Sequence, residues 1–146
     1  MESGAIANSQ LTASSEYDIH HSPKRARLHT REAYPYGRGA WTSLTNDLNQ
    51  WLQVDLGKIT PVTHVATQGR NSFSPTQTVT KYKLQFSHDG ASFLFYKRQG
   101  ESSDAVNIHF MTSLAILTQR WSTKTAYIFF QSRDLPHTSH ITASRL

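Results

Sequence analysis

The residues best suited to metal binding or acid–base chemistry are eight histidines, of which only two are adjacent. His20 and His21 form that pair, with Asp18 just before them and His29 eight residues further on. Zinc sites need three or four converging ligands, and no His-Glu-x-x-His or comparable spacing is present. The sequence also lacks a Gly-x-Ser-x-Gly elbow, a P-loop and a dinucleotide fingerprint. We therefore predict exposed loop histidines, no catalytic residue, no metal site and no cofactor.

A second group of residues combines aromatic rings with cations around a turn. The segment 31–38 begins and ends with arginine and contains Tyr34 and Tyr36 on either side of a proline, followed by Gly37. Such rings and guanidinium groups can stack on sugar rings or enter a groove on a protein partner. The alternative is a loop that packs its own tyrosines, and the sequence leaves both interpretations open.

The elements that must position these loops are expected to be strands. Residues 51–56 alternate between aliphatic and other side chains before Gly57, which predicts a strand that ends there. Either the aliphatic set or the Trp51 side could face inward, and a central strand would bury both. A second strand is expected at 60–67, after a turn at Gly57-Lys58. In a third, at 78–87, one alternating set is the expected core face: Thr80, Tyr82, Leu84 and Phe86.

The remaining elements are also short. Asp89-Gly90 is typical of a β-hairpin turn, so residues 93–96 are the expected partner strand. Residues 10–14 are expected to form the first strand or a turn of helix, and 126–131 and 140–146 the closing strands. Many short strands without an amphipathic helix predict an all-β sandwich.

Length and composition indicate one folded domain. A chain of 146 residues can bury a real core, so we expect 1–146 to form a single domain. No apolar run approaches the ~20 residues of a membrane-spanning helix, and no basic-then-apolar leader is present. The chain is then either cytosolic or a piece of a longer secreted protein. The net charge of +5 permits attraction to anionic surfaces, but without a nucleic-acid motif we predict no nucleic-acid partner.

Five motifs keep one order and spacing that match a known family. Gln-Trp-Leu-Gln-Val-Asp-Leu-Gly ends at Gly57, and its tryptophan lies ten residues after Trp41. The others are Ser-Gln-Leu-Thr-Ala-Ser-Ser at 9–15, Ala-Arg-Leu-His at 26–29, Val-Ala-Thr-Gln-Gly-Arg at 65–70, and the strand and turn at 80–90. From about residue 1 to 100 the chain resembles the discoidin domain, also called the coagulation factor V/VIII C-type domain, of the galactose-binding-like superfamily. The resemblance implies a discoidin-type jelly-roll β-sandwich with ligand-binding loops that project from one end.

The resemblance also implies where the ligand would bind. Residues 17–23 correspond to the first projecting loop, whose apolar tip beside cations would suit insertion into an anionic membrane surface. The alternative is an ordinary solvated loop with Tyr17 packed inward. The third loop, 70–75, offers one aromatic ring, one cation and one amide. The predicted ligand-binding residues are Tyr17, Ile19, His20, His21, Lys24, Tyr34, Tyr36, Arg38, Arg70, Asn71 and Phe73.

Two motif residues are expected to serve structure instead. Arg27 is expected to make an internal ion pair, for example with Asp55, and Trp41 to be a buried anchor under the loops. Beyond Gly100 the resemblance weakens, which marks a divergent segment at about 101–124. The family carries a cysteine just outside each end, so the absence of cysteine is interpreted as truncation or natural loss.

The expected function is a non-enzymatic extracellular adhesion module that binds cell-surface or matrix protein or glycan ligands through its end loops. Two alternatives stay open: docking on an anionic phospholipid surface, and service as a carbohydrate-binding accessory module of a larger enzyme. The polar loop tips slightly favour the protein or glycan ligand over the membrane. The sequence does not determine the oligomeric state.

Overall fold

The computed structural model describes residues 4–70, 79, 82–97 and 115–130. Within these ranges the regular elements are strands and short 3-10 helices, which confirms the predicted all-β class. In chain order they are η1 (Asn8–Gln10), β1 (Leu11–Ala13), η2 (Ile19–His21), η3 (Pro23–Arg25), β2 (Trp51–Thr67), β3 (Tyr82–Ser87), β4 (Leu94–Phe95) and β5 (Ala115–Phe130). None of the described residues forms a helix that is long and apolar enough to cross a membrane.

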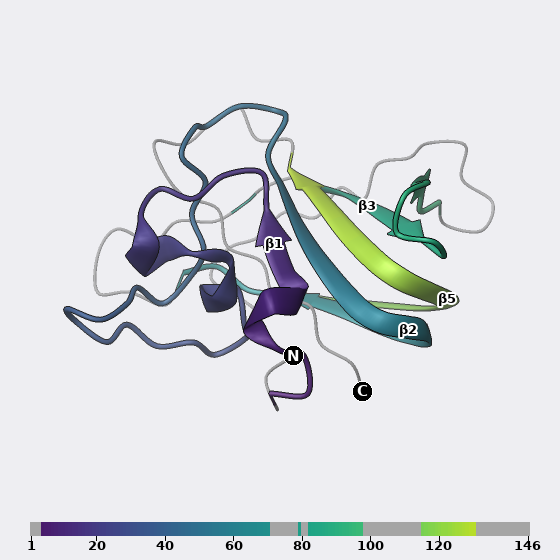
Figure 1. Ribbon diagram of the computed structural model, residues 1–146, viewed down its shortest axis with the longest axis horizontal. Helices are drawn as coiled ribbons and strands as arrows, with labels where there is room; N and C mark the ends of the chain where they lie inside the picture. Colours follow the sequence, from purple (N-terminus) through teal and green to yellow (C-terminus); the bar gives the residue numbers. More distant parts are fainter. Residues whose placement is uncertain (1–3, 71–78, 80–81, 98–114, 131–146) are drawn as a thin grey trace.

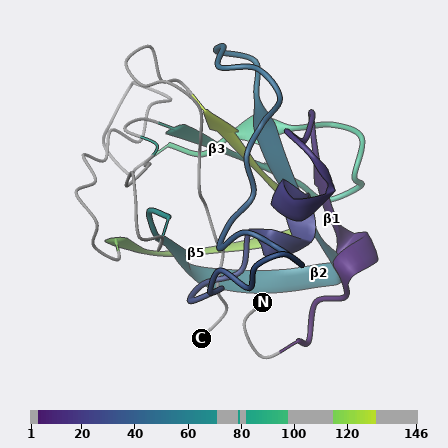
Figure 2. The same cartoon turned by 90° about the vertical axis from the view of Figure 1, so that its left-hand side faces the viewer.

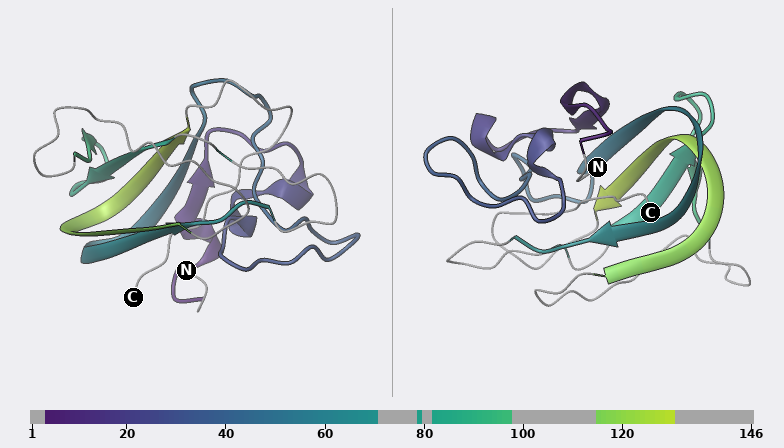
Figure 3. Two further views of the ribbon diagram at one scale, coloured as in Figure 1. Left: turned by 180° about the vertical axis from the view of Figure 1, so that it is seen from behind. Right: turned by 90° about the horizontal axis from the view of Figure 1, so that it is seen from below.

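The strands form one antiparallel sheet in the order β1-β2-β5-β3-β4 (Figure 1). The start of β2 pairs with the end of β5, and register shifts interrupt this ladder between Asp55 and Thr60 and between Val62 and His64. Such irregularities bend a strand and increase its twist. Figure 3 shows β2 and β5 curving back along their length, so that the two halves of the pair face each other. β1 pairs only with residues 52–54 of β2, and β3 pairs only with residues 125–130 of β5, so both strands extend the same half of the β2–β5 pair. The other half of that pair belongs to the second layer, and one sheet therefore forms both layers of a sandwich.

Two predicted strand boundaries are wrong for this reason. Gly57 and Lys58 do not end a strand but form the bend within β2, where Gly57 has a φ of +74° and its N–H donates to Asp55 Oδ1 at 2.7 Å. The closing strand expected at 126–131 begins at Ala115 in β5, so part of the segment interpreted as divergent belongs to the longest ladder. The strand expected at 140–146 and residues 101–114 lie outside the described residues.

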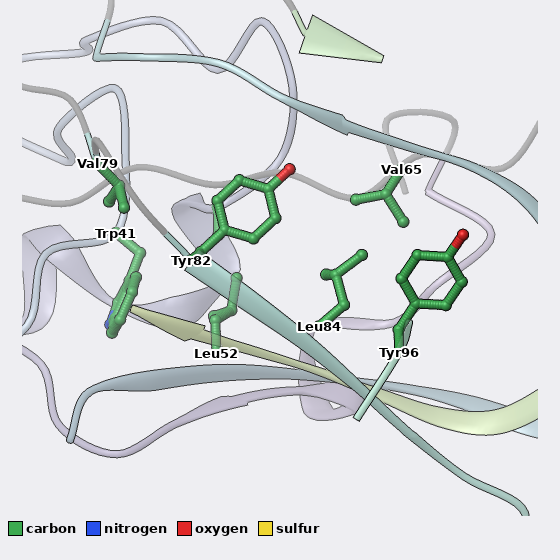
Figure 4. Packing of buried hydrophobic residues seen from close by; sticks show 8 residues of the cluster. Trp41, Leu52, Val65, Val79, Tyr82, Leu84 and Tyr96 are labelled. Carbon is green, nitrogen blue, oxygen red and sulfur yellow. The ribbon is translucent and has the colours of Figure 1, made fainter. Parts of the chain in front are cut away.

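The core lies between the two layers. Figure 4 shows Val65, from the second half of β2, pointing toward Leu84 and Tyr82 of β3. Leu52 and Val54 are buried, so the aliphatic side of β2 faces inward while Trp51 is half-buried. The main cluster contains Ala26, Trp41, Leu52, Val65, Val79, Tyr82, Leu84 and Tyr96.

The expected core face of β3 is confirmed for Tyr82 and Leu84, and Phe86 packs against the cluster while partly buried. Val79 is buried as well, although the alternation assigned it to the opposite face. It precedes the first residue of β3, where the two-residue period of a strand does not yet apply.

Trp41 is fully buried, as predicted. Its indole Nε1–H donates to the Ser15 carbonyl oxygen at 2.9 Å. The same side chain therefore belongs to the core and holds the segment that leads into the first loop.

Candidate ligand-binding surface

The first loop is organised by Asp18. Its Oδ1 accepts hydrogen bonds from the backbone N–H groups of His20 at 2.9 Å and His21 at 3.0 Å, which caps η2. The same oxygen lies 2.6 Å from His21 Nδ1. Burial alone would raise the pKa of the Asp18 carboxyl, but the bonds from the His21 ring and the two amides outweigh it and lower that pKa.

His21 is buried, whereas the sequence predicted exposed loop histidines. Its ring is enclosed because it pairs with Asp18 and lies edge-on to Tyr17, with the ring centroids 5.5 Å apart. Tyr17 is nevertheless 52% exposed, so it does not pack inward, and Ile19 is 65% exposed. Lys24 is exposed and His20 is half-buried.

The first loop is joined to the following segment by backbone hydrogen bonds. Arg38 N–H donates to the His20 carbonyl at 2.9 Å, and Thr42 N–H donates to the His21 carbonyl at 3.1 Å. Tyr17 N–H donates to the Thr42 carbonyl at 2.8 Å. Figure 2 shows this long connection between β1 and β2 on the viewer's side of the sheet.

The second loop contains a tight turn at its tip. Ala33 and Gly37 exchange two backbone hydrogen bonds of 2.9 and 3.0 Å, so the residues between them project together. Tyr34 is 78% and Tyr36 is 80% exposed. The Arg38 guanidinium lies 5.3 Å from the centre of the Tyr34 ring, which covers part of that ring. The alternative of a loop that hides its tyrosines is therefore not what the chain adopts.

Arg25 links η3 to this turn. Its Nη2 donates to the Tyr36 carbonyl at 2.7 Å. A Cβ placed on Gly37 would lie 1.7 Å from the same nitrogen, so the guanidinium rests directly against the glycine. The turn therefore needs glycine at 37 for close approach.

Arg70 reaches the second loop from the end of β2. Glu32 Oε1 is shared between Arg38 Nη1 and Arg70 Nη2, the second at 3.8 Å. The side chain of Arg70 is only 12% exposed, and burial lowers the pKa of its guanidinium, with Glu32 opposing and Arg38 reinforcing that shift. Arg70 thus supports the surface from inside. Asn71 and Phe73, the other predicted residues of the third loop, lie outside the described residues.

A further loop, 43–50, was not predicted to contribute. Leu44 is 57% and Leu48 is 39% exposed, and Leu44 N–H donates to Ser15 Oγ at 3.0 Å. The signal available in the sequence was two leucines in an otherwise polar run before the strand. Sequence reasoning also missed the supporting roles of Asp18, Arg25 and Glu32, because each depends on a partner elsewhere in the loops.

Asp47 closes this loop. Its Oδ1 accepts from Asn49 N–H at 2.7 Å and Gln50 Nε2 at 3.0 Å, while Oδ2 accepts from Thr45 Oγ1 at 2.9 Å. These bonds, chiefly that from Gln50, lower the pKa of the carboxyl. Across the described ranges, no three His, Cys, Asp or Glu side chains are grouped to hold a metal ion.

Arg27 bonds inward. Its Nη2 donates to the Ile6 carbonyl at 2.6 Å and to Asn8 Oδ1 at 2.9 Å, which supports the predicted structural role. The pairing of Arg27 with Asp55 stays a prediction.

Comparison with known proteins identifies a family and relatives that this chain resembles in sequence. Residues 10–127 match the family model described as the F5/8 type C domain. Coagulation factor V of Sus scrofa is 39% identical over 111 residues, which is 73% of this chain and 5% of that protein. Lactadherin of Rattus norvegicus is 38% identical over 110 residues, which is 70% of this chain and 24% of that protein. The chain thus spans a quarter or less of the length of these two relatives.

Solved structures agree with the fold. Recombinant discoidin II of Dictyostelium discoideum superimposes with a TM-score of 0.70 at 22% identity, over 91% of this chain and 51% of that one. A fucose binding module from Streptococcus pneumoniae gives a TM-score of 0.67 at 19% identity, over 97% and 94%. At such low identity these likenesses show the fold alone, and they confirm the predicted jelly-roll sandwich.

Proposed function

Because the chain belongs to the F5/8 type C, or discoidin, domain family and is a non-enzymatic binding module, we propose that it is extracellular and recognises cell-surface or matrix protein or glycan ligands through its end loops. The observation that carries this proposal is the turn at 33–37, on which two tyrosines are almost fully exposed although their backbone is fixed.

Exposed aromatic rings on a fixed turn are suited to binding. Burying one such ring contributes about 1.5–3 kcal/mol of hydrophobic free energy. A backbone already ordered by the Ala33–Gly37 bonds and by Arg25 loses less entropy when a ligand binds. The fucose binding module, which shares this fold, is described by a sugar ligand, and that description supports the glycan candidate.

The predicted residues divide into two roles in this proposal. Those that would touch the ligand are exposed or half-buried: Tyr17, Ile19, His20, Lys24, Tyr34, Tyr36 and Arg38. His21 and Arg70 would hold the loops from inside, through Asp18 and Glu32. Asn71 and Phe73 lie one and three positions after Arg70 in the sequence, and we propose them as ligand contacts as well.

The parent protein is part of the proposal. We propose that residues 1–146 form one domain of a larger secreted or cell-surface protein and that nucleic acid is not a partner. In the alternative architecture the domain is attached to a catalytic domain. It would then be an accessory carbohydrate-binding module, and the same loops would bind carbohydrate for that enzyme. Sequencing the transcript on both sides of this region would decide between the two architectures.

A second candidate is docking on an anionic phospholipid surface. It is supported by Ile19 and Leu44, which are both more than half exposed on neighbouring segments that are joined by the Tyr17–Thr42 hydrogen bond. Aliphatic side chains beside cations can enter the headgroup region of a bilayer. Phosphatidylserine vesicles therefore belong in any test of function.

The test is binding of the purified domain to a glycan array, collagen and phosphatidylserine vesicles, compared with the variant Tyr17→Ala/Tyr34→Ala/Tyr36→Ala. We expect that variant to lose binding to the ligand that the natural chain binds. Ile59→Ala is the control, because Ile59 is 60% exposed at the bend of β2, away from the loops. The proposal would be wrong if the triple variant bound as well as the natural chain.

A further inference from the structure

We propose that the turn at 33–37 and the neighbouring helix η3 recognise an anionic polysaccharide, that is, a glycan chain carrying sulfate or carboxylate groups. This inference rests on the proposed function and names the ligand class for one part of the surface. We call this part the basic turn; its residues are Lys24, Arg31, Tyr34, Tyr36 and Arg38.

The charge of the loops is concentrated here. Between His20 and Arg38 the chain has five lysines and arginines but a single acidic residue, Glu32. Glu32 is already engaged by Arg38 and Arg70. Lys24 and Arg31 are exposed, and neither has an ion-pair partner among the described residues. The charges of Lys24 and Arg31 therefore have no ion-pair partner among the described residues, while that of Arg38 is paired with Glu32.

The basic turn is fixed before any ligand arrives. Arg25 N–H donates to the Ser22 carbonyl at 2.8 Å, which closes η3, while the Arg25 side chain reaches across to Tyr36. Lys24 therefore lies on the short helix that is hydrogen-bonded to the turn through Arg25. Arg25 acts as a positioning residue, since its guanidinium is occupied by the Tyr36 carbonyl and packed against Gly37.

The order of side chains favours a polysaccharide over a membrane. In the sequence, cations stand on both sides of the two rings, at Arg31 and Arg38, and the tip between them carries two exposed tyrosines and no Leu, Ile or Val. A sugar ring can stack on the exposed tyrosines while its sulfates or carboxylates accept hydrogen bonds from the exposed Arg31 guanidinium and Lys24 ammonium groups. Insertion of the same tip into a bilayer would bury no Leu, Ile or Val side chain. The exposed aliphatic residues of the loops, Ile19, Leu44 and Leu48, belong to other segments.

The test measures binding of the domain to a heparin oligosaccharide, to the same oligosaccharide after chemical desulfation, to galactose and to phosphatidylserine vesicles. We expect heparin binding that weakens about tenfold or more on desulfation, because charge-assisted hydrogen bonds are lost. The affinity should also fall as salt rises from roughly 50 to 200 mM. Binding releases counterions from the polyanion, and this release is less favourable at higher salt concentration.

Lys24→Gln/Arg31→Gln should weaken heparin binding about tenfold or more without a change in melting temperature, because both side chains are exposed. The matched control is Lys58→Gln/Lys83→Gln, which removes the same charge from the sheet and should keep most of the affinity. Equal losses in both variants would show attraction by net charge and would overturn the inference.

The remaining outcomes separate the inference from the proposed function. Glycan binding that survives desulfation, or binding of galactose alone, would overturn the anionic ligand and keep the binding module. Binding of phosphatidylserine without heparin would overturn it in favour of the membrane candidate. Failure to bind any of these probes, or any glycan or matrix protein on an array, would count against both.

Discussion

The two-layer sheet and the loops at its end are held together by different forces. Between the layers, side chains such as Leu52, Val65 and Leu84 are removed from water and need no specific polar partner. In the loops, the shape depends on bonds to a few charged groups, chiefly Asp18, Glu32 and Arg25. A packed core tolerates little change in volume, whereas an exposed tyrosine on a bonded turn can be replaced at little cost to folding.

This difference suggests that stability and ligand choice are separable in the molecule. Trp41 is the point at which they meet, because its ring belongs to the core while its Nε1–H holds Ser15 at the start of the first loop. Substitutions in the core, in the loop network and on the turn should then differ in size and in kind.

Trp41→Ala should have the largest effect. Loss of the buried ring should lower the free energy of unfolding by about 3–5 kcal/mol, and the released loop should also bind more weakly. Urea denaturation measures the first effect and ligand titration of the folded fraction the second. Leu52→Ala is the matched control: about 2–5 kcal/mol less stable, with unchanged affinity. Equal loss of affinity in both variants would show that the two regions are not separable.

Glu32→Gln should come next. The substitution leaves Arg38 and the largely buried side chain of Arg70 without their shared carboxylate, which should cost about 1.5–3 kcal/mol. Urea denaturation of this variant beside Glu16→Gln, at an exposed position, gives the comparison. A loss of unfolding free energy no greater than that of Glu16→Gln would show that the ion network does not stabilise the fold.

Asp18→Ala should cost about 1 kcal/mol at neutral pH, because the cap of η2 is lost. The folded chain lowers the pKa of Asp18, so the ionised carboxylate stabilises the fold above its unfolded pKa of about 3.9. That contribution disappears as pH falls through the lower, folded pKa. The stability difference between the natural chain and the variant should therefore be largest above about pH 5 and shrink in stronger acid. Urea denaturation of both proteins at several pH values measures this difference. A difference that stays constant with pH would contradict this account.

Gly37→Ala should have the smallest effect on global stability and a clear local one. The added methyl would meet Arg25 Nη2 at 1.7 Å, so the guanidinium must leave the turn. Chymotrypsin should then cleave after Tyr36 several-fold faster, because local opening becomes easier. Arg25→Ala should give the same rate, and the double variant should add nothing further. Additive rates would show that the two residues act independently.

Much of the sheet was predictable because its signals are local. Two-residue alternation grouped Leu52 and Val54 on one face but left open which face is buried, and the Asp89-Gly90 pair predicted the turn between β3 and β4. In that turn Gly90 has a φ of +82°, and Asp89 Oδ1 accepts from the amides of Ala91 and Ser92 at 2.8 Å each.

The extent of β2 and β5 was not predictable in the same way. A bulge interrupts the two-residue period of a strand. In addition, a glycine in the sequence does not show whether the strand bends there or ends there, and Gly57 is such a case. Only the ladder to Thr123 and Thr125 shows that the strand continues.

The sequence indicated candidate residues in the loops but left their exposure open, and it missed the residues that support them. Tyr34 and Tyr36 stand out in the sequence as rings beside a proline and a glycine, but the sequence left open whether they pack inward. The sharing of Glu32 between Arg38 and Arg70 joins residues 38 positions apart, and nothing in their spacing indicates it.

The most direct test of the central claim is to map ligand contacts on the isotope-labelled domain by the shifts of its backbone amide signals in NMR spectra. Heparin oligosaccharide, galactose and short-chain phosphatidylserine would be titrated in turn. We predict that the ligand that binds shifts amides within 17–38 and near Arg70, and leaves the bend at 57–60 and strand β4 unchanged. Shifts centred on the bend or on β4 would show that the ligand binds the sheet and would contradict the account.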